Sequence, residues 1–319
     1  MPRNIRLYPR TDKNSPTTST PETPETINNQ TGTFSTSLSR QSTSQTTFTS
    51  WIPFRQPFFS PPDVALNLQM IDLLPGSSTL GIDTTATNIT TSGFTVRVAT
   101  THDTAISDIA GQWMAIPPSV PQWSPDYQTG QFGILSVRDR ADTGHANNAG
   151  EVFFKRPYAT PPKVVVWIHA FDFGANTGWR LNAFPTNIRG KGFTVNVNSW
   201  SNTVLYSANV SWVAWPAEEK GVAGNYWTPT MKRINGTAEV ANAGFTNTSW
   251  IPFNQGVKRR TFPELMMGFS QVDVAASKAG MKLAVENGIA SDGVNCTVRS
   301  FGNVTVWTTG LKVAWLVAT

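Results

Sequence analysis

The sequence predicts an all-β protein in which three antiparallel β-sandwiches follow one another along the chain. Three observations predict this fold class: apolar and polar residues alternate with a period of two, turn-forming residues are abundant, and a set of markers returns about every hundred residues. The 319 residues include 24 glycines and 22 prolines, and only 14% of them are charged. This composition is typical of many short strands joined by turns.

The N-terminal segment differs from the rest of the chain. Residues 1–27 are rich in Ser, Thr and Pro, and Arg3, Arg6 and Arg10 lie near their start. A segment with so few apolar side chains cannot form a core of its own. We therefore expect a disordered arm over residues 1–27.

The repeated markers keep one order along the chain, although the first of them is missing from the third copy. They are Gln-Thr-Gly at Gln30 and Gln128, prolines at Pro62, Pro162 and Pro263, aspartates at Asp72, Asp172 and Asp273, glycines at Gly93, Gly192 and Gly293, and tryptophans at Trp113, Trp212 and Trp315. They predict three homologous units, over residues 28–118 (unit 1), 126–217 (unit 2) and 230–319 (unit 3). Linkers are expected near 119–127 and 217–227.

Within each unit the residue pattern indicates strands, and helical stretches are hard to find. In unit 2, residues 163–173 form a nearly continuous apolar run, which is typical of an inner strand. Residues 192–200 alternate between apolar and polar side chains, as expected of a strand with one face toward a core. About six such strands per unit predict a six-stranded sandwich.

Metal, cofactor and enzymatic functions find little support. The three histidines, His102, His145 and His169, do not cluster in sequence with Cys296, so we expect neither a metal site nor a Cys-His nucleophile. No nucleotide-binding fingerprint is present, and we expect no cofactor. Asp172 has a counterpart in each of the other two units, which favours a structural role over catalysis. We therefore expect a protein that is not an enzyme.

Charge and hydropathy limit the partners and the location. A net charge of +5 over this length makes nucleic acid an unlikely partner. The opening residues MPRNIRLYPR are not followed by an apolar stretch, so neither a secretory signal nor a membrane span is expected. We expect a cytoplasmic protein, or one released without a classical signal peptide.

A polar turn between two aromatic residues marks a candidate site in unit 2. Ser201-Asn202-Thr203 separates Trp200 from Tyr206, and both rings lie off the core-facing stripe. Exposed rings near an arginine, here Arg180, are suited to a sugar, because a ring packs on the apolar face of a pyranose and a guanidinium donates to its hydroxyls. In the alternative interpretation, the rings only brace the hairpin.

Residues 128–216 resemble an H-type lectin domain. The resemblance depends on Gln-Thr-Gly at 128, FFKRPYATPPKVVV from 153, the aspartate of FDF, WRL, GFTVNVNSW and YSANVSWVAW. An arginine, a tryptophan twenty residues later and a tyrosine six residues after that are characteristic of the family, as here at Arg180, Trp200 and Tyr206. The resemblance implies six-stranded sandwiches that associate as trimers and bind galactose and N-acetylgalactosamine near subunit contacts.

The resemblance also implies roles for individual residues of unit 2. Arg180 would bond the ring-side hydroxyls, and Trp200 and Tyr206 would shape the pocket. Asp142 would accept a hydrogen bond from the axial hydroxyl, with Asp139 as the alternative. Ser201 stands where the snail member of the family has a histidine, so a preference for the N-acetyl group does not follow.

The other two units match this pattern less well. In unit 1 the arginine, tryptophan and tyrosine positions hold Gly81, Thr101 and Ser107, while His102 occupies the histidine position and could serve a neighbouring site. In unit 3 the arginine position is Met281, with Lys282 beside it. Phe301 and Trp307 keep the aromatic spacing there, so a weaker site through Lys282, Phe301 and Trp307 is expected.

Tandem units of such a family predict several glycan sites in one particle. The particle is expected to be either a homotrimer or an intrachain pseudo-trimer that presents terminal galactose or N-acetylgalactosamine sites. The rival hypothesis is an assembly protein, or one that binds an anionic partner through the basic arm and a basic patch from residues 231–233 and 257–260.

Overall fold

A computed structural model describes most of the chain. The described residues are 29–39, 45–118, 127–144, 146–229, 239–240, 246–253, 264–275, 280–290, 292–301, 306–307 and 310–318, with only the backbone described at 239–240, 301 and 306–307. The predicted arm, His145, the first linker and both basic segments lie outside these residues, apart from Tyr127 at the end of that linker. Nowhere in the described part of the chain does an apolar helix of membrane-spanning length occur.

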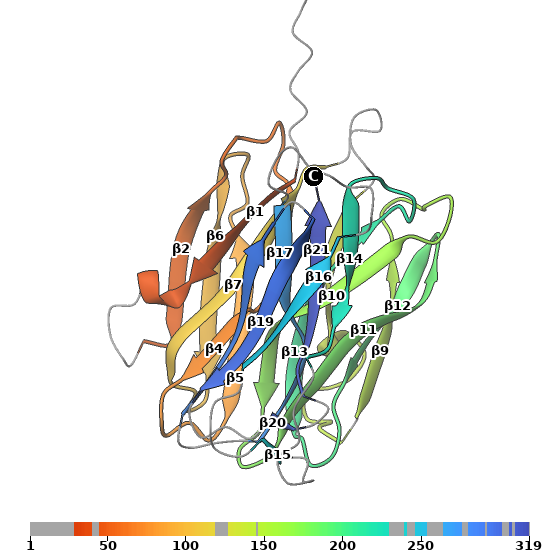
Figure 1. Cartoon of the computed structure of the whole chain (residues 1–319). Helices are drawn as coiled ribbons and strands as arrows, with labels where there is room; N and C mark the ends of the chain where they lie inside the picture. Colours follow the sequence, from red (N-terminus) through yellow and green to blue (C-terminus); the bar gives the residue numbers. More distant parts are fainter. Residues whose placement is uncertain are drawn as a thin grey trace, which may run out of the picture.

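The all-β prediction is confirmed, since strands account for almost all of the regular structure (Figure 1). Unit 1 contains β1 (Gln30–Ser35), β2 (Thr47–Pro53), β3 (Asp63–Leu66), β4 (Met70–Leu73), β5 (Leu80–Thr87), β6 (Gly93–Thr101) and β7 (Ile106–Ile116). Unit 2 contains β8 (Gln128–Gly133), β9 (Asn147–Phe153), β10 (Lys163–Phe173), β11 (Trp179–Arg189), β12 (Gly192–Asn198) and β13 (Leu205–Trp215). Unit 3 contains β15 (Glu239–Val240), β16 (Thr246–Pro252), β17 (Glu264–Val274), β18 (Met281–Ile289), β19 (Gly293–Phe301), β20 (Val306–Trp307) and β21 (Lys312–Ala318). Short 3-10 turns, Thr36–Leu38 and Ile134–Ser136, follow β1 and β8.

The second predicted linker is partly wrong, because residues 217–227 include a strand. β14 (Val222–Trp227) pairs antiparallel with β21 of unit 3, as β1 pairs with β7 and β8 with β13. Glycine and polar residues hide the strand pattern in this stretch. Gly224 is needed there because a side chain would meet the ring of Trp215, 2.7 Å from the position of a Cβ.

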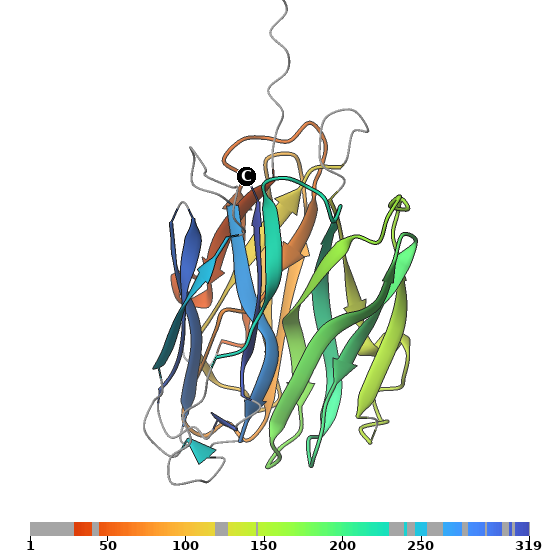
Figure 2. The ribbon, with the colours of Figure 1, turned by 45° about the vertical axis from the view of Figure 1, so that its right-hand side comes forward.

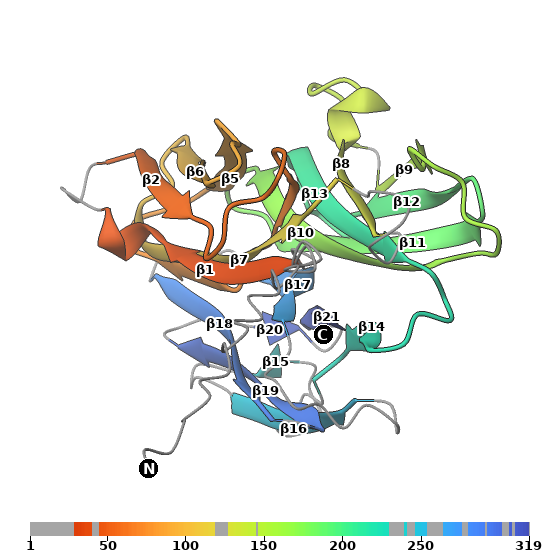
Figure 3. The ribbon, with the colours of Figure 1, turned by 90° about the horizontal axis from the view of Figure 1, so that it is seen from above.

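Each of the three sheets is shared between two units. Their strand orders are β1-β7-β4-β18-β19-β16 for units 1 and 3, β2-β6-β5-β10-β13-β8 for units 1 and 2, and β14-β21-β17-β11-β12-β9 for units 3 and 2. Seen from above, the units form a closed triangle in which β7, β10 and β17 lie toward the centre (Figure 3). Every unit therefore continues a sheet of each neighbour, through the pairs β5–β10, β11–β17 and β4–β18.

Two kinds of apolar core hold this arrangement. Within each unit, the two layers of a sandwich enclose a tryptophan and phenylalanines; Figure 2 shows the two layers of unit 2 separately (green strands). Phe54 and Trp113 have ring centroids 5.8 Å apart in unit 1, and Phe154 and Trp212 are 5.9 Å apart in unit 2. A second core lies where the units meet.

This central core combines side chains from all three units. Ala65 and Met114 of unit 1, Trp167 of unit 2 and Leu316 of unit 3 belong to it, and all are buried. The Trp167 indole Nε1–H donates to the Ala314 carbonyl oxygen at 2.8 Å, which satisfies a buried polar group across a unit boundary. The centre is therefore packed as a protein interior.

His169 lies fully inside the junction between units 1 and 2. Its Nδ1–H donates to the Thr84 carbonyl oxygen at 2.8 Å, while the Thr84 hydroxyl donates to the His169 carbonyl oxygen at 2.5 Å. Burial lowers the pKa of His169, although the Thr84 hydrogen bond and the charge of Asp83 oppose this. The ring is a bonded core histidine, as its place in the inner strand predicts.

This burial predicts acid lability. An unfolded histidine binds a proton below about pH 6.5, whereas His169 in the folded protein does so only at lower pH. The contribution of neutral His169 to the free energy of unfolding should be fully present above pH 6.5. It should decrease as the pH falls from 6.5 toward 5. Urea denaturation across this range measures the slope, and in His169→Gln the slope should be smaller. An equal slope in both proteins would contradict the prediction.

Candidate functional site

The three junctions between units place one repeated aspartate against a different residue each time. Asp72 of β4 lies opposite Lys282 of β18, Asp172 of β10 lies opposite Gly81 of β5, and Asp273 of β17 lies opposite Arg180 of β11. By this register, the position of unit 3 that corresponds to Arg180 is Lys282, one residue beyond the Met281 expected from sequence spacing. The partner of each aspartate decides what its junction can do.

At the junction of units 2 and 3, the guanidinium of Arg180 is held on several sides. Arg180 Nε lies 3.1 Å from Asp273 Oδ1, and the two side chains are only 10% and 2% exposed. Nη1 donates to Asn202 Oδ1 at 2.8 Å and lies 3.5 Å from the Thr203 hydroxyl. Arg180 thus joins two units and the turn after Trp200, a structural role that the sequence did not suggest.

The turn after Trp200 is held by hydrogen bonds through Thr203, while Ser201 and part of Trp200 are exposed to solvent. The Thr203 N–H donates to the Trp200 carbonyl oxygen at 3.3 Å, and the Thr203 hydroxyl donates to the Gly178 carbonyl oxygen at 2.7 Å. Ser201 is exposed and has a φ of +58°, and Trp200 is partly exposed. The turn therefore presents Trp200 and Ser201 to solvent near the buried Arg180.

Tyr206 contributes to the junction of units 1 and 2. Its ring centroid lies 6.0 Å from that of His102 of unit 1 and 5.5 Å from the guanidinium carbon of Arg140. His102 has a φ of +55° and occupies the same turn position in unit 1 as Ser201 in unit 2. The predicted site residues of unit 2 are thus divided, with Arg180, Trp200 and Ser201 around one junction and Tyr206 at another.

A buried carboxylate organises the second of these junctions. Asp172, whose side chain is 5% exposed, pairs with Arg140, and His102 Nε2 lies 3.2 Å from its Oδ1. The Thr101 hydroxyl donates to the same carboxylate at 3.2 Å. These groups can reach Asp172 because Gly81 opposite it has no side chain; a Cβ there would lie 1.8 Å from the Thr101 hydroxyl oxygen.

The loop that carries Asp139, Arg140 and Asp142 is held in place by Arg138. Its guanidinium donates to the Asn148 amide oxygen at 2.7 Å and to the carbonyl oxygens of Asp142 and Leu205 at 2.5 and 2.6 Å. Burial lowers the pKa of Arg138, and the charge of Asp142 opposes this. Asp139 is exposed and Asp142 is partly buried, so the structure leaves both carboxylates as candidates.

The weaker predicted site of unit 3 is only partly described. Lys282 Nζ lies 3.5 Å from Asp72 Oδ2, and the two side chains are 37% and 23% exposed. Phe301 is paired with Lys282 in the sheet, and Trp307 lies in β20, but their side chains are outside the described residues. This junction has a cation and a carboxylate on its surface.

The junction of units 1 and 2 brings His102, Arg140 and Tyr206 together around the buried Asp172. His102 and Arg140 have half-exposed side chains, 45% and 51%, over the buried carboxylate. Imidazole and guanidinium N–H groups can donate to hydroxyls, and the phenol ring offers an apolar face. Sequence reasoning missed Arg140, although it lies between the two aspartates considered.

The described residues contain no group of three His, Cys, Asp or Glu side chains that could hold a metal ion. Cys296, the single cysteine, is buried, and burial raises the pKa of its thiol to about 12. A thiol with such a pKa remains protonated near neutral pH and is a poor nucleophile.

Comparison with known proteins identifies a family over two segments. The H-type lectin domain model matches residues 49–116 and 150–215, which lie in units 1 and 2. The predicted resemblance to this family is therefore confirmed over these segments, and it supports a carbohydrate-binding lectin. No curated protein matches the chain significantly.

Two solved structures of discoidin II from Dictyostelium discoideum are similar to the chain. The native recombinant protein is 14% identical, with 52% of this chain and 81% of that chain covered and a TM-score of 0.25. The wild-type protein is 16% identical, with 52% and 80% covered and a TM-score of 0.25.

The buried pair at the junction of units 2 and 3 predicts a large loss of stability. Asp273→Asn should lower the free energy of unfolding by about 3–5 kcal/mol, because it leaves the Arg180 guanidinium buried without its counter-charge. The matched change Asp72→Asn, at the more exposed pair with Lys282, should cost about 1 kcal/mol or less. Chemical denaturation of both variants measures the difference, and equal losses would contradict the prediction.

Proposed function

We propose that this chain, which carries two segments of the H-type lectin domain, is a multivalent lectin for galactose- or N-acetylgalactosamine-type glycans. The best-formed site is at the junction of units 1 and 2. The observation that carries the proposal is the approach of His102 from one unit to Tyr206 and Arg140 of the next, above the buried Asp172. The resemblance implies sites near subunit contacts, and this junction has the residue types that such a site needs.

The roles proposed for the individual residues follow from their exposure. Tyr206 would pack against the apolar face of the pyranose, while Arg140 and His102 would donate to its hydroxyls. Asp142, or Asp139 in the alternative, would accept a hydrogen bond from the axial hydroxyl. Asp172 would keep Arg140 and His102 in position from beneath.

A second site is proposed at the junction of units 2 and 3, where Trp200 and Ser201 are open to solvent. Arg180 is mostly buried there, so its proposed role is to hold the turn and to supply positive charge near the sugar. The remaining junction, with Lys282 and Asp72 at its surface, would form the weakest site.

The closed ring of shared sheets supports an intrachain pseudo-trimer over a homotrimer. The pairs β5–β10, β11–β17 and β4–β18 connect every unit to both others within one chain. Single shallow sugar sites are weak, with dissociation constants near 1 mM, or roughly 4 kcal/mol. Several sites in one particle would raise the avidity for clustered glycans.

Sugar titration tests the proposed site directly. Methyl galactoside or N-acetylgalactosamine, followed by NMR, should bind with a dissociation constant near 1 mM. Tyr206→Ala and His102→Ala should each weaken binding about tenfold, the equivalent of 1.4 kcal/mol, because the first removes the ring on which the sugar packs and the second removes a hydrogen-bond donor. Glu218→Gln, a change at an exposed residue beyond β13, is the control.

Chromatography on a galactose resin separates a lectin from a protein that binds anionic partners. Retention on a galactose resin should persist in moderate salt and end when free sugar is added, whereas nucleic-acid binding would be lost with salt alone. Elution by salt together with no response to sugar would refute the proposal.

Light scattering tests the assembly. A pseudo-trimer should have the mass of one chain, 34.8 kDa. It should nevertheless agglutinate galactose-bearing cells, because one chain has several sites. An obligate particle of three chains would favour the homotrimer, and a strictly monovalent monomer would contradict multivalency.

A further inference from the structure

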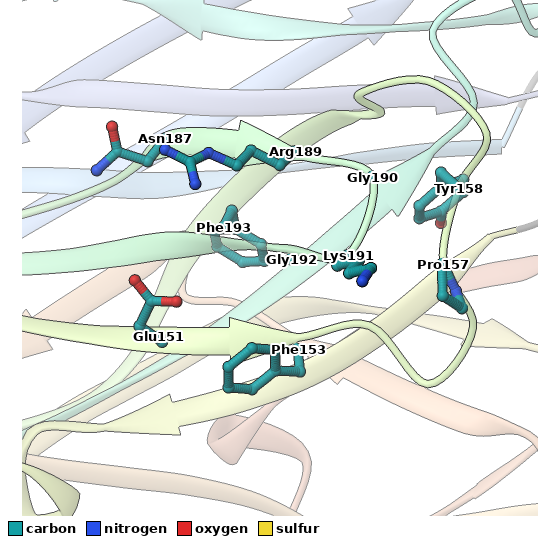
Figure 4. A pocket seen from close by; sticks show the side chains of 10 residues that line it. All are labelled: Glu151, Phe153, Pro157, Tyr158, Asn187, Arg189, Gly190, Lys191, Gly192 and Phe193. Atoms are coloured by element: carbon teal, nitrogen blue, oxygen red, sulfur yellow. The ribbon is translucent and has the colours of Figure 1, made fainter.

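A surface groove on unit 2 lies at the other end of β11 from Arg180. It has a volume of about 550 Å³ and is formed where β9 meets the hairpin between β11 and β12. Its lining includes Glu151, Phe153, Asn187, Arg189, Lys191 and Gly192, which Figure 4 shows around the strand end. None of these residues belongs to the sites at the junctions.

The floor of the groove is a glycine between a ring and a guanidinium. Gly192 of β12 is paired on one side with Phe153 of β9 and on the other with Arg189 of β11. Residues directly opposite one another share a face of the sheet, so the Phe153 and Arg189 side chains flank the bare backbone of Gly192. Phe153 is 73% exposed, which is unusual for a large apolar side chain.

The other two units show what normally covers this glycine. In unit 1 the Trp51 ring lies 2.7 Å from the position that a Cβ would take on Gly93, and in unit 3 the Trp250 ring lies 2.2 Å from that position on Gly293. Both rings therefore lie across their glycines.

Unit 2 differs at the same register position. Trp51 and Trp250 are paired with the residue two positions after the glycine, and in unit 2 this place belongs to Glu151. The atoms nearest to a Cβ on Gly192 are backbone atoms of Val152 and Phe153. Unit 2 thus has no ring over this glycine, and a groove lies where the glycines of the other two units are covered.

The charges of the groove favour an anion. Arg189 and Lys191 are both exposed, and within the described residues neither forms an ion pair. Glu151 supplies one opposing charge. Asn187, whose amide donates to the Thr194 hydroxyl at 3.3 Å, adds a polar group beside it. A guanidinium binds a carboxylate or sulfate with two parallel hydrogen bonds, and a flat ring accepts the apolar face of a pyranose.

We propose that this groove is a binding site of a different kind, for a monosaccharide that carries a carboxylate or a sulfate. The sugar ring packs on Phe153 over Gly192. Its anionic group binds Arg189, with Lys191 nearby. Glu151 accepts hydrogen bonds from the sugar hydroxyls, and the Asn187 amide exchanges hydrogen bonds with them. The site is independent of the proposed galactose sites, since it shares no residue with them.

An NMR titration of the full chain with methyl glucuronide tests this proposal. The glucuronide should give saturable shifts in the wild-type protein, and the uncharged methyl glucoside should bind at least about tenfold more weakly. Arg189→Gln should weaken glucuronide binding about tenfold. Glu151→Trp, which restores the ring found in units 1 and 3, should abolish it by filling the groove.

Matched controls make the outcomes distinct. Arg97→Gln removes a half-exposed arginine, which lies 3.6 Å from Asp83, from β6 of unit 1 and should leave glucuronide binding unchanged. Titration with methyl galactoside should be the same in wild type and both groove variants, which also shows that these variants are folded. No saturable response to glucuronide, an equal response to the uncharged glucoside, or unchanged binding in Glu151→Trp would each overturn the proposal. Loss of the galactoside response alone in all proteins would refute the proposed galactose function and leave the groove standing.

Discussion

The pairing of open sheet edges between units is the constraint on which the rest of the structure depends. A sandwich of this kind has edge strands whose N–H and C=O groups need partners. Here one edge of each such strand pairs within its own unit, and the other edge pairs with a strand of a neighbouring unit, as in β5–β10, β11–β17 and β4–β18. Each unit contributes strands to two sheets, and in each sheet one of its strands pairs with a strand of a neighbouring unit, so the three units close into a ring. The buried side chains of Trp167 and Leu316 fill the centre of this ring.

The same pairing brings functional groups together. Because β10 continues the sheet of β5, Asp172 arrives beside Thr101 and His102 of another unit. What happens next depends on the opposing residue. Arg180 pairs with Asp273 and fills the space between the two units at that junction. Gly81 has no side chain, so Asp172 remains accessible to the half-exposed Arg140 and His102. One framework thus yields a closed junction and an open one.

Much of the fold could be predicted from local pattern. The alternation in 192–200 and the apolar run in 163–173 correspond to β12 and β10, because side chains on a strand point to opposite faces in turn. β14 was missed because Gly224 and its polar neighbours conceal the alternation. Edge pairing between units was not visible, since register between distant strands leaves no local signature.

The candidate site was predictable as a set of residue types but not as an arrangement. Spacing along one unit placed Arg180, Trp200 and Tyr206 together, whereas the structure turns Tyr206 toward unit 1 and buries Arg180 against unit 3. The contribution of Arg140 depends on a loop held by Arg138, a long-range contact with Leu205 that no motif encodes. The recurrence of Asp172 and Asp273 was the available signal, and it marked the junctions.

Joining the three units in one polypeptide has a genetic consequence. A ring built from identical chains repeats every substitution three times, so a change that harms one corner harms them all. In this chain Gly81, Arg180 and Lys282 occupy corresponding places and could diverge one at a time. Because each corner of this chain has its own residues, one corner can change without the others, and a single molecule can hold unlike surfaces at fixed separation.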